Sequence, residues 1–255
     1  MRAQERWKQL LDEVNTQGHV KIAELSQKIG CSEITLRNDI RTLDQQGLLK
    51  KVYGGAIRKE RSLTVSFMPG EYFLNAERKQ AIAAKAYEYI DNRGSIIIDD
   101  STTGCYLAEY IKEHSEKRVV VVTNSLYVAS LLSSCEHTEV FMLGGHIGAN
   151  PPSSLDNITV NNIGQFHVDK AFVGINGINL EVGLTSIGTP QMDTKKEMIR
   201  VSNKTYVLAD STKFGTGNLF RVCTMDEIEL IITDMDLSEE QKKLAKEHQI
   251  KIELV

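Results

Sequence analysis

Two features are scarce in this sequence: cysteine and long apolar runs. Its four cysteines are widely separated and form no CxxC pair: Cys31, Cys105, Cys135 and Cys223. This scarcity indicates neither a disulfide framework nor a zinc site, and we expect no metal and no cofactor. No apolar run approaches the roughly 20 residues of a membrane span. The first residues, MRAQERWKQLLDEV, are typical of an amphipathic helix rather than a signal peptide. We therefore expect a cytoplasmic protein without a membrane partner.

Familiar catalytic motifs are missing as well. The sequence contains no GxSxG elbow, no HExxH helix and no Walker phosphate loop. It therefore lacks the local signatures of α/β-hydrolases, zinc proteases and P-loop nucleotide hydrolases. Its 255 residues are long enough for two domains. These absences favour a binding function over catalysis.

Charge is divided unevenly along the chain. The overall net charge is −4, but residues 1–61 contain 12 Lys and Arg against 8 Asp and Glu, a net of +4. The remainder contains 18 against 26, a net of −8. A basic end on an acidic body suits a protein that presents this end to nucleic acid. Because the basic excess is modest, a single copy would bind DNA weakly, and we expect a homo-oligomer, a dimer or tetramer, that binds paired half-sites.

The stretch CSEITLRNDIRTLDQQGLLKKVYGGA, residues 31–56, predicts a helix followed by a short hairpin. Ser32 suits an N-cap, and Leu36, Ile40 and Leu43 recur at i, i+4 and i+7 on one face. The preceding residues, VKIAELSQKIGCS, predict another helix that ends in a tight turn, so the pair indicates a helix-turn-helix. LLKKVYGGA adds a basic hairpin at a glycine pair. Together these patterns predict a winged helix-turn-helix.

The outer face of the second helix and the hairpin hold the candidate DNA-binding residues. Arg and Asn pair with guanine and adenine edges, and hydroxyl and Lys side chains suit phosphate oxygens. A solvated amphipathic helix is the simpler interpretation of this helix alone, and a helix-turn-helix that docks only on protein is a third. The helix pair and the basic hairpin favour DNA. The candidates are Ser32, Thr35, Arg37, Asn38, Arg41, Lys50, Lys51 and Tyr53.

The same stretch resembles a family signature. LRNDIRTLDQQGLLKKVYGGA is similar to the signature of the DeoR family of bacterial transcriptional regulators, in which an Arg-Arg-Asp-Leu run leads to a wing ending in Gly-Gly-Ala. The matching residues are Arg37, Asp39, Leu43, Gly47, Gly54, Gly55 and Ala56. Asn38 stands where the family commonly has a second Arg, which changes the group available for a base or phosphate contact. The resemblance implies a transcriptional regulator, expected to be a repressor.

A linker and a second domain are predicted beyond the wing. We place the winged helix at 1–58, a linker containing the Pro69-Gly70 turn at 59–75, and the second domain at 76–255. In that domain, short β-branched runs such as SIIIDD, RVVVVTNS, KTYVLADS and IELIITD alternate with helical patterns. This alternation predicts an α/β fold with a doubly wound parallel sheet that is buried on both faces.

Polar residues follow five of the predicted strands: DDSTTG, TNS, GG, GING and DSTK. Ligands of doubly wound sheets bind outside the carboxyl ends of the strands. Hydroxyls, amides at a helix N-terminus and a lysine are groups that hold a phosphate. Any one of these segments is commonly a helix cap or a turn. Five together favour a small polar ligand, expected to be phosphorylated.

The second domain also resembles a known sensor. Its segments follow, in order, the sugar-phosphate sensor domain of DeoR-family regulators, which is related to ribose-5-phosphate isomerase: DDSTT, VTNS, MLGG, DKAFVGINGI, GLTS, QMDTKKEMI and LADSTKFG. Gly148, Asn176 and Gln191 stand where the family often has Arg, Asp and Glu, so the pocket carries less charge. The resemblance implies that the effector pocket or its walls contain Ser101, Thr102, Thr103, Asn124, Gly145, Lys195 and Lys213. Asp99 and Asn176, at the ends of predicted strands, complete the effector-binding candidates.

Two functions from different classes remain. The first is a repressor of sugar-metabolism genes that leaves its operator DNA when a phosphorylated sugar binds, although effector-dependent activation is thermodynamically as easy. The second is a sugar-phosphate isomerase-like enzyme, which needs a positioned general base. Asn176 cannot serve as this base, whereas Asp99, Asp100 and Asp210 lie at predicted strand ends. We predict the regulator, and no enzymatic activity.

Overall fold

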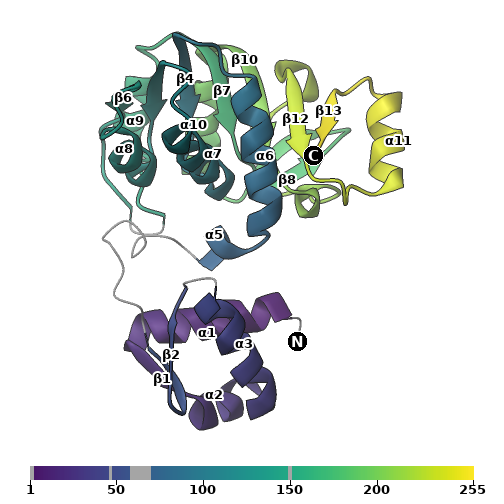
Figure 1. Cartoon of the computed structure of the whole chain (residues 1–255). Helices are drawn as coiled ribbons and strands as arrows, with labels where there is room; N and C mark the ends of the chain where they lie inside the picture. The colour runs from purple at the N-terminus through teal and green to yellow at the C-terminus, as the bar shows by residue number, and fades with distance from the viewer. Residues whose placement is uncertain (1–2, 46–47, 58–69, 149–150) are drawn as a thin grey trace. The chain divides into compact units, whose positions relative to one another are not determined.

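The computed structural model describes residues 3–45, 48–57, 70–148 and 151–255. The chain divides into two compact units, Met1–Leu74 and Asn75–Val255 (Figure 1). Most of the predicted linker, 59–75, lies outside the described residues. Its last part contains a short helix, α5 (Gly70–Phe73), which belongs to the first unit. The linker itself therefore remains a prediction.

The first unit packs three helices and a small sheet around one apolar core. The helices are α1 (Ala3–Gln17), α2 (Ile22–Ile29) and α3 (Glu33–Gln45). The antiparallel sheet has the order β1 (His19–Lys21), β3 (Gly55–Ile57), β2 (Lys50–Val52). Leu36, Ile40 and Leu43 of α3 are completely buried in this core, as their spacing predicted. Strand β1 was not predicted, because three residues are too few to show an alternating pattern.

The glycine pair of the hairpin is required by the backbone. Gly54 lies in the two-residue turn between β2 and β3 with φ at +75°, a conformation that favours glycine. Gly55 pairs with Lys21 of β1, and a β-carbon at Gly55 would overlap the carbonyl oxygen of Val20. The pair therefore allows both the tight turn and the close approach of the third strand.

The second unit is built on a seven-stranded sheet in which every neighbouring pair is parallel. The strand order is β13 (Ile252–Leu254), β12 (Leu230–Thr233), β10 (Ser202–Leu208), β7 (Val168–Val173), β4 (Gly94–Ile98), β5 (Val119–Thr123), β6 (Thr138–Met142). The first strand of this sheet in sequence, β4, lies beside the fourth, β7, and the chain winds outward from both. The doubly wound prediction is confirmed, with its topological switch point between β4 and β7.

Helices cover both faces of this sheet (Figure 1). They are α6 (Ala76–Glu88), α7 (Thr102–Glu113), α8 (Leu126–Leu132), α9 (Asn157–Ile163), α10 (Thr189–Arg200) and α11 (Glu239–Glu247). Successive residues of a strand point to opposite faces, yet Ile96, Ile97 and Ile98 of β4 are all buried. The central strand is therefore enclosed on both sides, which explains its continuous apolar run.

A small antiparallel sheet was not predicted. It has the order β11 (Phe220–Cys223), β9 (Gly183–Ser186), β8 (Gly177–Asn179). Two single-turn 3-10 helices, η1 (Ser211–Lys213) and η2 (Met225–Glu227), flank β11. Within the described ranges, no helix has the length and apolar character that crossing a membrane requires.

Candidate DNA interface and effector site

Helix α3 begins at the cap that the sequence predicted. Ser32 Oγ accepts a hydrogen bond from the backbone N–H of Thr35 at 3.2 Å, and the hydroxyl oxygens of the two residues lie 2.9 Å apart. This contact satisfies one of the free amides of the first turn. In a helix-turn-helix the N-terminal residues of the second helix meet the base edges. Both hydroxyls lie at the N-terminus of α3, and their contact with DNA remains a prediction.

The outer face of α3 carries the predicted polar residues. Arg37, Asn38 and Arg41 are all exposed, opposite the buried face. The Arg37 guanidinium lies 3.0 Å from Glu33 Oε2, one turn earlier. Because both partners are exposed, this ion pair is weak, and Arg37 can exchange it for a contact to DNA.

The hairpin presents a second exposed group beside α3. Lys50 and Lys51 of β2 are exposed, and Tyr53 is fully exposed in the turn. The backbone N–H of Lys51 donates to Asp44 Oδ1 of α3 at 3.1 Å, which ties the hairpin to the helix. All eight candidate DNA-binding residues therefore lie on α3, its cap or the attached wing of one compact unit.

A largely buried ion pair that the sequence did not predict holds α3 against α1. Asp39 accepts from Arg6 Nε at 2.5 Å and from the second Arg6 nitrogen at 3.0 Å. The indole N–H of Trp7 donates to the same carboxylate at 2.7 Å. The Asp39 hydrogen bonds raise the pKa of the Arg6 guanidinium, although burial opposes this. Trp7 therefore does more than fill the core, because it also satisfies a buried carboxylate.

Asp99 and Lys195 form the centre of the switch point. Asp99 is 0% exposed and follows β4, and its carboxylate accepts from the Gly174 N–H at 2.9 Å and from the Ser101 N–H at 3.1 Å. The Lys195 ammonium, on α10 and 5% exposed, forms an ion pair with the same carboxylate. Burial lowers the pKa of Lys195, but Asp99 and then Asp100 outweigh it, so the net shift is upward. Lys195 is thus held as the ammonium, and its ion pair with Asp99 joins the ends of β4 and β7 to α10.

The beginning of α7 lies directly over this pair. Ser101 caps α7 by accepting from the Gly104 N–H at 3.0 Å, and Thr102 and Thr103 form the first helical turn. A β-carbon at Gly174 would overlap the Ser101 side chain. The absence of a side chain at Gly174 therefore lets the end of β7 approach the N-terminus of α7, where free amides favour an anion.

The end of β5 adds a buried amide. The Asn124 side chain donates to the Ser154 carbonyl at 3.0 Å, while its own Oδ1 is buried and has no hydrogen-bond partner in the described part of the chain. Next to it, the Ser153 hydroxyl donates to Asp100 Oδ2 at 2.7 Å. Neither serine was predicted as a site residue, because neither follows a predicted strand. The only sequence signal for them was the run PPSS, residues 151–154.

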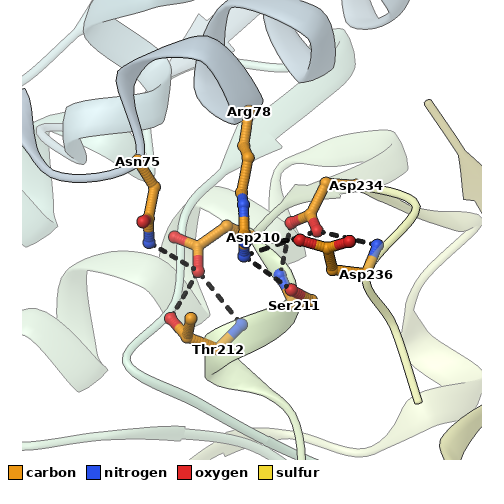
Figure 2. Close-up of polar contacts among 7 residues, drawn as sticks. All are labelled: Asn75, Arg78, Asp210, Ser211, Thr212, Asp234 and Asp236. Atoms are coloured by element: carbon orange, nitrogen blue, oxygen red, sulfur yellow. Dashed lines mark hydrogen bonds and ion pairs between the residues drawn. The ribbon is translucent and has the colours of Figure 1, made fainter.

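Figure 2 shows the polar contacts at the end of β10. They involve Asn75, Arg78, Asp210, Ser211, Thr212, Asp234 and Asp236. Arg78 of α6 donates to the Ser211 hydroxyl at 3.0 Å and lies 3.6 Å from Asp234. Asp234, which follows β12, accepts from the Ser211 N–H at 2.7 Å. These contacts hold the end of β10 to α6 and β12, so Asp210 and Asp234 are occupied by internal bonds.

The remaining candidates follow other strands or lie beyond the end of β7. Asn176 is exposed, and its Oδ1 accepts from the Ser186 hydroxyl at 3.2 Å. Gly145 is exposed in the loop after β6, and Lys213 is half-buried in η1. Among the residues described, no hydrogen bond or ion pair joins Gly145 or Lys213 to Asp99. The structure therefore brings together the candidates at the end of β4, at the start of α7 and on α10. The other four, Asn124, Gly145, Asn176 and Lys213, follow β5, β6, β7 and β10 at the same edge of the sheet.

Comparison with known proteins agrees with this two-part arrangement. Residues 6–62 match the model of the DeoR-like helix-turn-helix domain, and residues 74–235 match the model of the DeoR C-terminal sensor domain. The HTH-type transcriptional regulator GolR of Listeria innocua is 30% identical over 230 residues, which cover 90% of each chain. The glycerol-3-phosphate regulon repressor of Escherichia coli K12 is 27% identical over 254 residues, which cover 100% of each chain.

The structural similarity to an enzyme is lower. Ribose 5-phosphate isomerase A from Methanocaldococcus jannaschii shares 19% identity with a TM-score of 0.40 over 55% of each chain, which supports no statement about activity. The matched family model assigns the α/β unit as a sensor, and the relatives are transcriptional regulators rather than enzymes. With both domain models matched in order, the chain belongs to the DeoR family of transcriptional regulators.

Proposed function

We propose that this chain is a repressor of sugar-metabolism genes that binds operator DNA through α3 and its wing. In this proposal, a phosphorylated sugar at the carboxyl edge of the sensor sheet releases it from DNA. One observation carries the proposal: the first unit has an exposed helix face with two arginines, and the second unit has a polar switch point in its sheet. The name of the glycerol-3-phosphate regulon repressor, a relative over the whole chain, agrees with this ligand class.

The proposed DNA contacts divide by chemistry. Arg37, Asn38 and Arg41 project from one exposed face and suit base edges, whereas Lys50 and Lys51 suit phosphates. The first 61 residues have a net charge of only +4, so paired binding by a homo-oligomer supplies the remaining affinity. Phosphate contacts make such binding steeply dependent on salt.

The proposed effector site lies over the switch point. The amides at the start of α7 and the half-buried Lys213 supply positive groups for a phosphate. Because Asp99 and Lys195 are buried and satisfy each other, their proposed role is to position the strand ends rather than to touch the ligand. Release of DNA requires that the ligand bind more tightly to the DNA-free arrangement of the oligomer.

The DNA half of the proposal predicts the effect of removing two arginines. The double substitution Arg37→Ala and Arg41→Ala should weaken specific operator binding by about 100-fold or more, because a base contact contributes about 1–3 kcal/mol. Fluorescence anisotropy with DNA from upstream of the gene, at two salt concentrations, measures this loss. The control, Arg118→Ala with Lys246→Ala, removes the same charge from exposed sites of the sensor unit. If the folded arginine variant bound the operator as tightly as the unsubstituted protein, α3 would not be the element that recognises DNA.

The effector half predicts the effect of removing one lysine. Lys213→Ala should raise the concentration of sugar phosphate needed for DNA release by about 10- to 100-fold, because a hydrogen bond to a charged group contributes about 1.5–3 kcal/mol. Operator affinity without effector should not change. The same anisotropy assay, titrated with a panel of sugar phosphates, measures both. Lys204→Ala, at the exposed opposite end of β10, is the matched control. A normal response of the Lys213 variant would place the phosphate elsewhere.

A further inference from the structure

Exposed apolar side chains in the first unit occur at two places. Of the large apolar side chains that the structure describes there, Ile34 is 73% exposed and Tyr53 is fully exposed, and the others are at least partly buried. Ile34 lies in the first turn of α3, and Tyr53 lies in the turn of the wing. Isolated exposed apolar residues are common on protein surfaces. Here, however, both occupy the elements that a winged helix places against DNA.

Ile34 is aligned with the polar residues of the outer face of α3. Together with Arg37, Asn38 and Arg41 it follows the spacing i, i+3, i+4 and i+7, which places all four side chains on one side of the helix. Ile34 is the most N-terminal of the four, two residues after the Ser32 cap. Since the N-terminal part of a recognition helix reaches deepest into the major groove, this side chain is placed near base edges rather than phosphates.

The major groove offers one apolar group to such a side chain. Adenine, guanine and cytosine present nitrogen and oxygen atoms there, whereas thymine also presents its C5-methyl group. An isoleucine pressed against a polar base edge would remove that edge from water without replacing its hydrogen bonds. Arg37 and Asn38 can supply the hydrogen bonds to neighbouring bases. An isoleucine at this place in the groove therefore favours a base with a methyl group.

We propose that Ile34 packs against the C5-methyl group of a thymine in each operator half-site and thereby determines specificity at that base pair. The inference rests on the proposed DNA-binding function, and it adds a base contact that the polar residues alone do not supply. It also predicts that Ile34 contributes to base selection without contributing to the dependence on salt, since it touches no phosphate.

A uracil scan tests the proposal. Full-length protein selects its site from a random-sequence duplex pool, and the selected duplex is resynthesised with each thymine replaced singly by uracil, which lacks only the methyl group. For the unsubstituted protein, one uracil per half-site should weaken binding about fourfold, the value expected for one buried methyl group. For Ile34→Ala, that same uracil should have no effect, and the slope of affinity against salt should match the unsubstituted protein.

Controls separate this contact from general damage. Ile34→Val keeps a β-branched apolar side chain and should retain sensitivity to the uracil. Ile158→Ala truncates an isoleucine of α9 that is 60% exposed, and it should behave as the unsubstituted protein. The proposal is overturned if no thymine is sensitive to uracil, or if Ile34→Ala keeps the full sensitivity. If no sequence is selected at all, the proposed function fails first, and this inference fails with it.

Discussion

Replacing Lys195 with methionine is expected to lower the free energy of unfolding of the sensor unit by about 3–5 kcal/mol, because removing one partner of a buried ion pair leaves the other charge without compensation. Asp99 is completely buried, and among the residues that the structure describes its carboxylate would then retain the amide donors of Gly174 and Ser101 alone. Urea denaturation followed by far-ultraviolet circular dichroism, which is dominated by the larger sensor unit, measures the loss.

Two variants and one pH series separate the pair from general effects. Lys196→Met, at the exposed neighbouring position, should change stability by no more than about 0.5 kcal/mol. Combining Asp99→Asn with Lys195→Met removes both charges and should restore part of the loss. Because the folded-state pKa of Lys195 is raised, its contribution is complete below the unfolded lysine pKa of about 10.4. The contribution declines only as pH rises through the folded pKa. If Lys195→Met were as stable as the unsubstituted protein, the buried ion pair between Lys195 and Asp99 would be contradicted.

Long and regular patterns predicted most of the architecture. The run Val119–Thr123 became the buried strand β5, and the spacing of Leu36, Ile40 and Leu43 became the buried face of α3. Such patterns are reliable because burial acts on many side chains at once. Strands β1, β8, β9 and β11, with three or four residues each, give no pattern of this kind. Strands β1, β9 and β11 form through pairing with partners that are distant in sequence, which local sequence does not encode, and β8 pairs with the equally short β9.

The candidate effector site was predicted at the level of the sheet edge and no further. Polar residues after strands indicated the edge, but the switch point depends on the order of the strands, and that order is visible only in the fold. Asp99 and Lys195 are 96 positions apart, and both were predicted among the effector-site residues, but the sequence did not predict that they bind each other. Distant side-chain pairs of this kind depend on tertiary structure, so a residue type at a strand end cannot reveal whether it faces a ligand.

The same limitation applies to Asp39, and it leads to the second large expected effect. Asp39→Ala should destabilise the DNA-binding unit by about 3–5 kcal/mol, because it leaves the largely buried Arg6 guanidinium and the Trp7 indole N–H without their acceptor. Since whole domains are stable by only about 5–15 kcal/mol, much of this small unit should unfold. Trp7 is the single tryptophan of the chain, so its fluorescence during urea denaturation reports on this unit separately from the sensor.

The Asp39 variant also distinguishes loss of a fold from loss of a contact. Asp39→Ala and the Arg37→Ala, Arg41→Ala pair should both strongly weaken operator binding. The arginine variant, however, should leave the Trp7 unfolding midpoint unchanged, because both arginines are exposed. Asp12→Ala, at an exposed position of α1, controls for the loss of one carboxylate. In each variant the circular dichroism transition of the sensor should stay in place. An unchanged Trp7 midpoint in Asp39→Ala would mean that apolar packing alone holds α3 against α1.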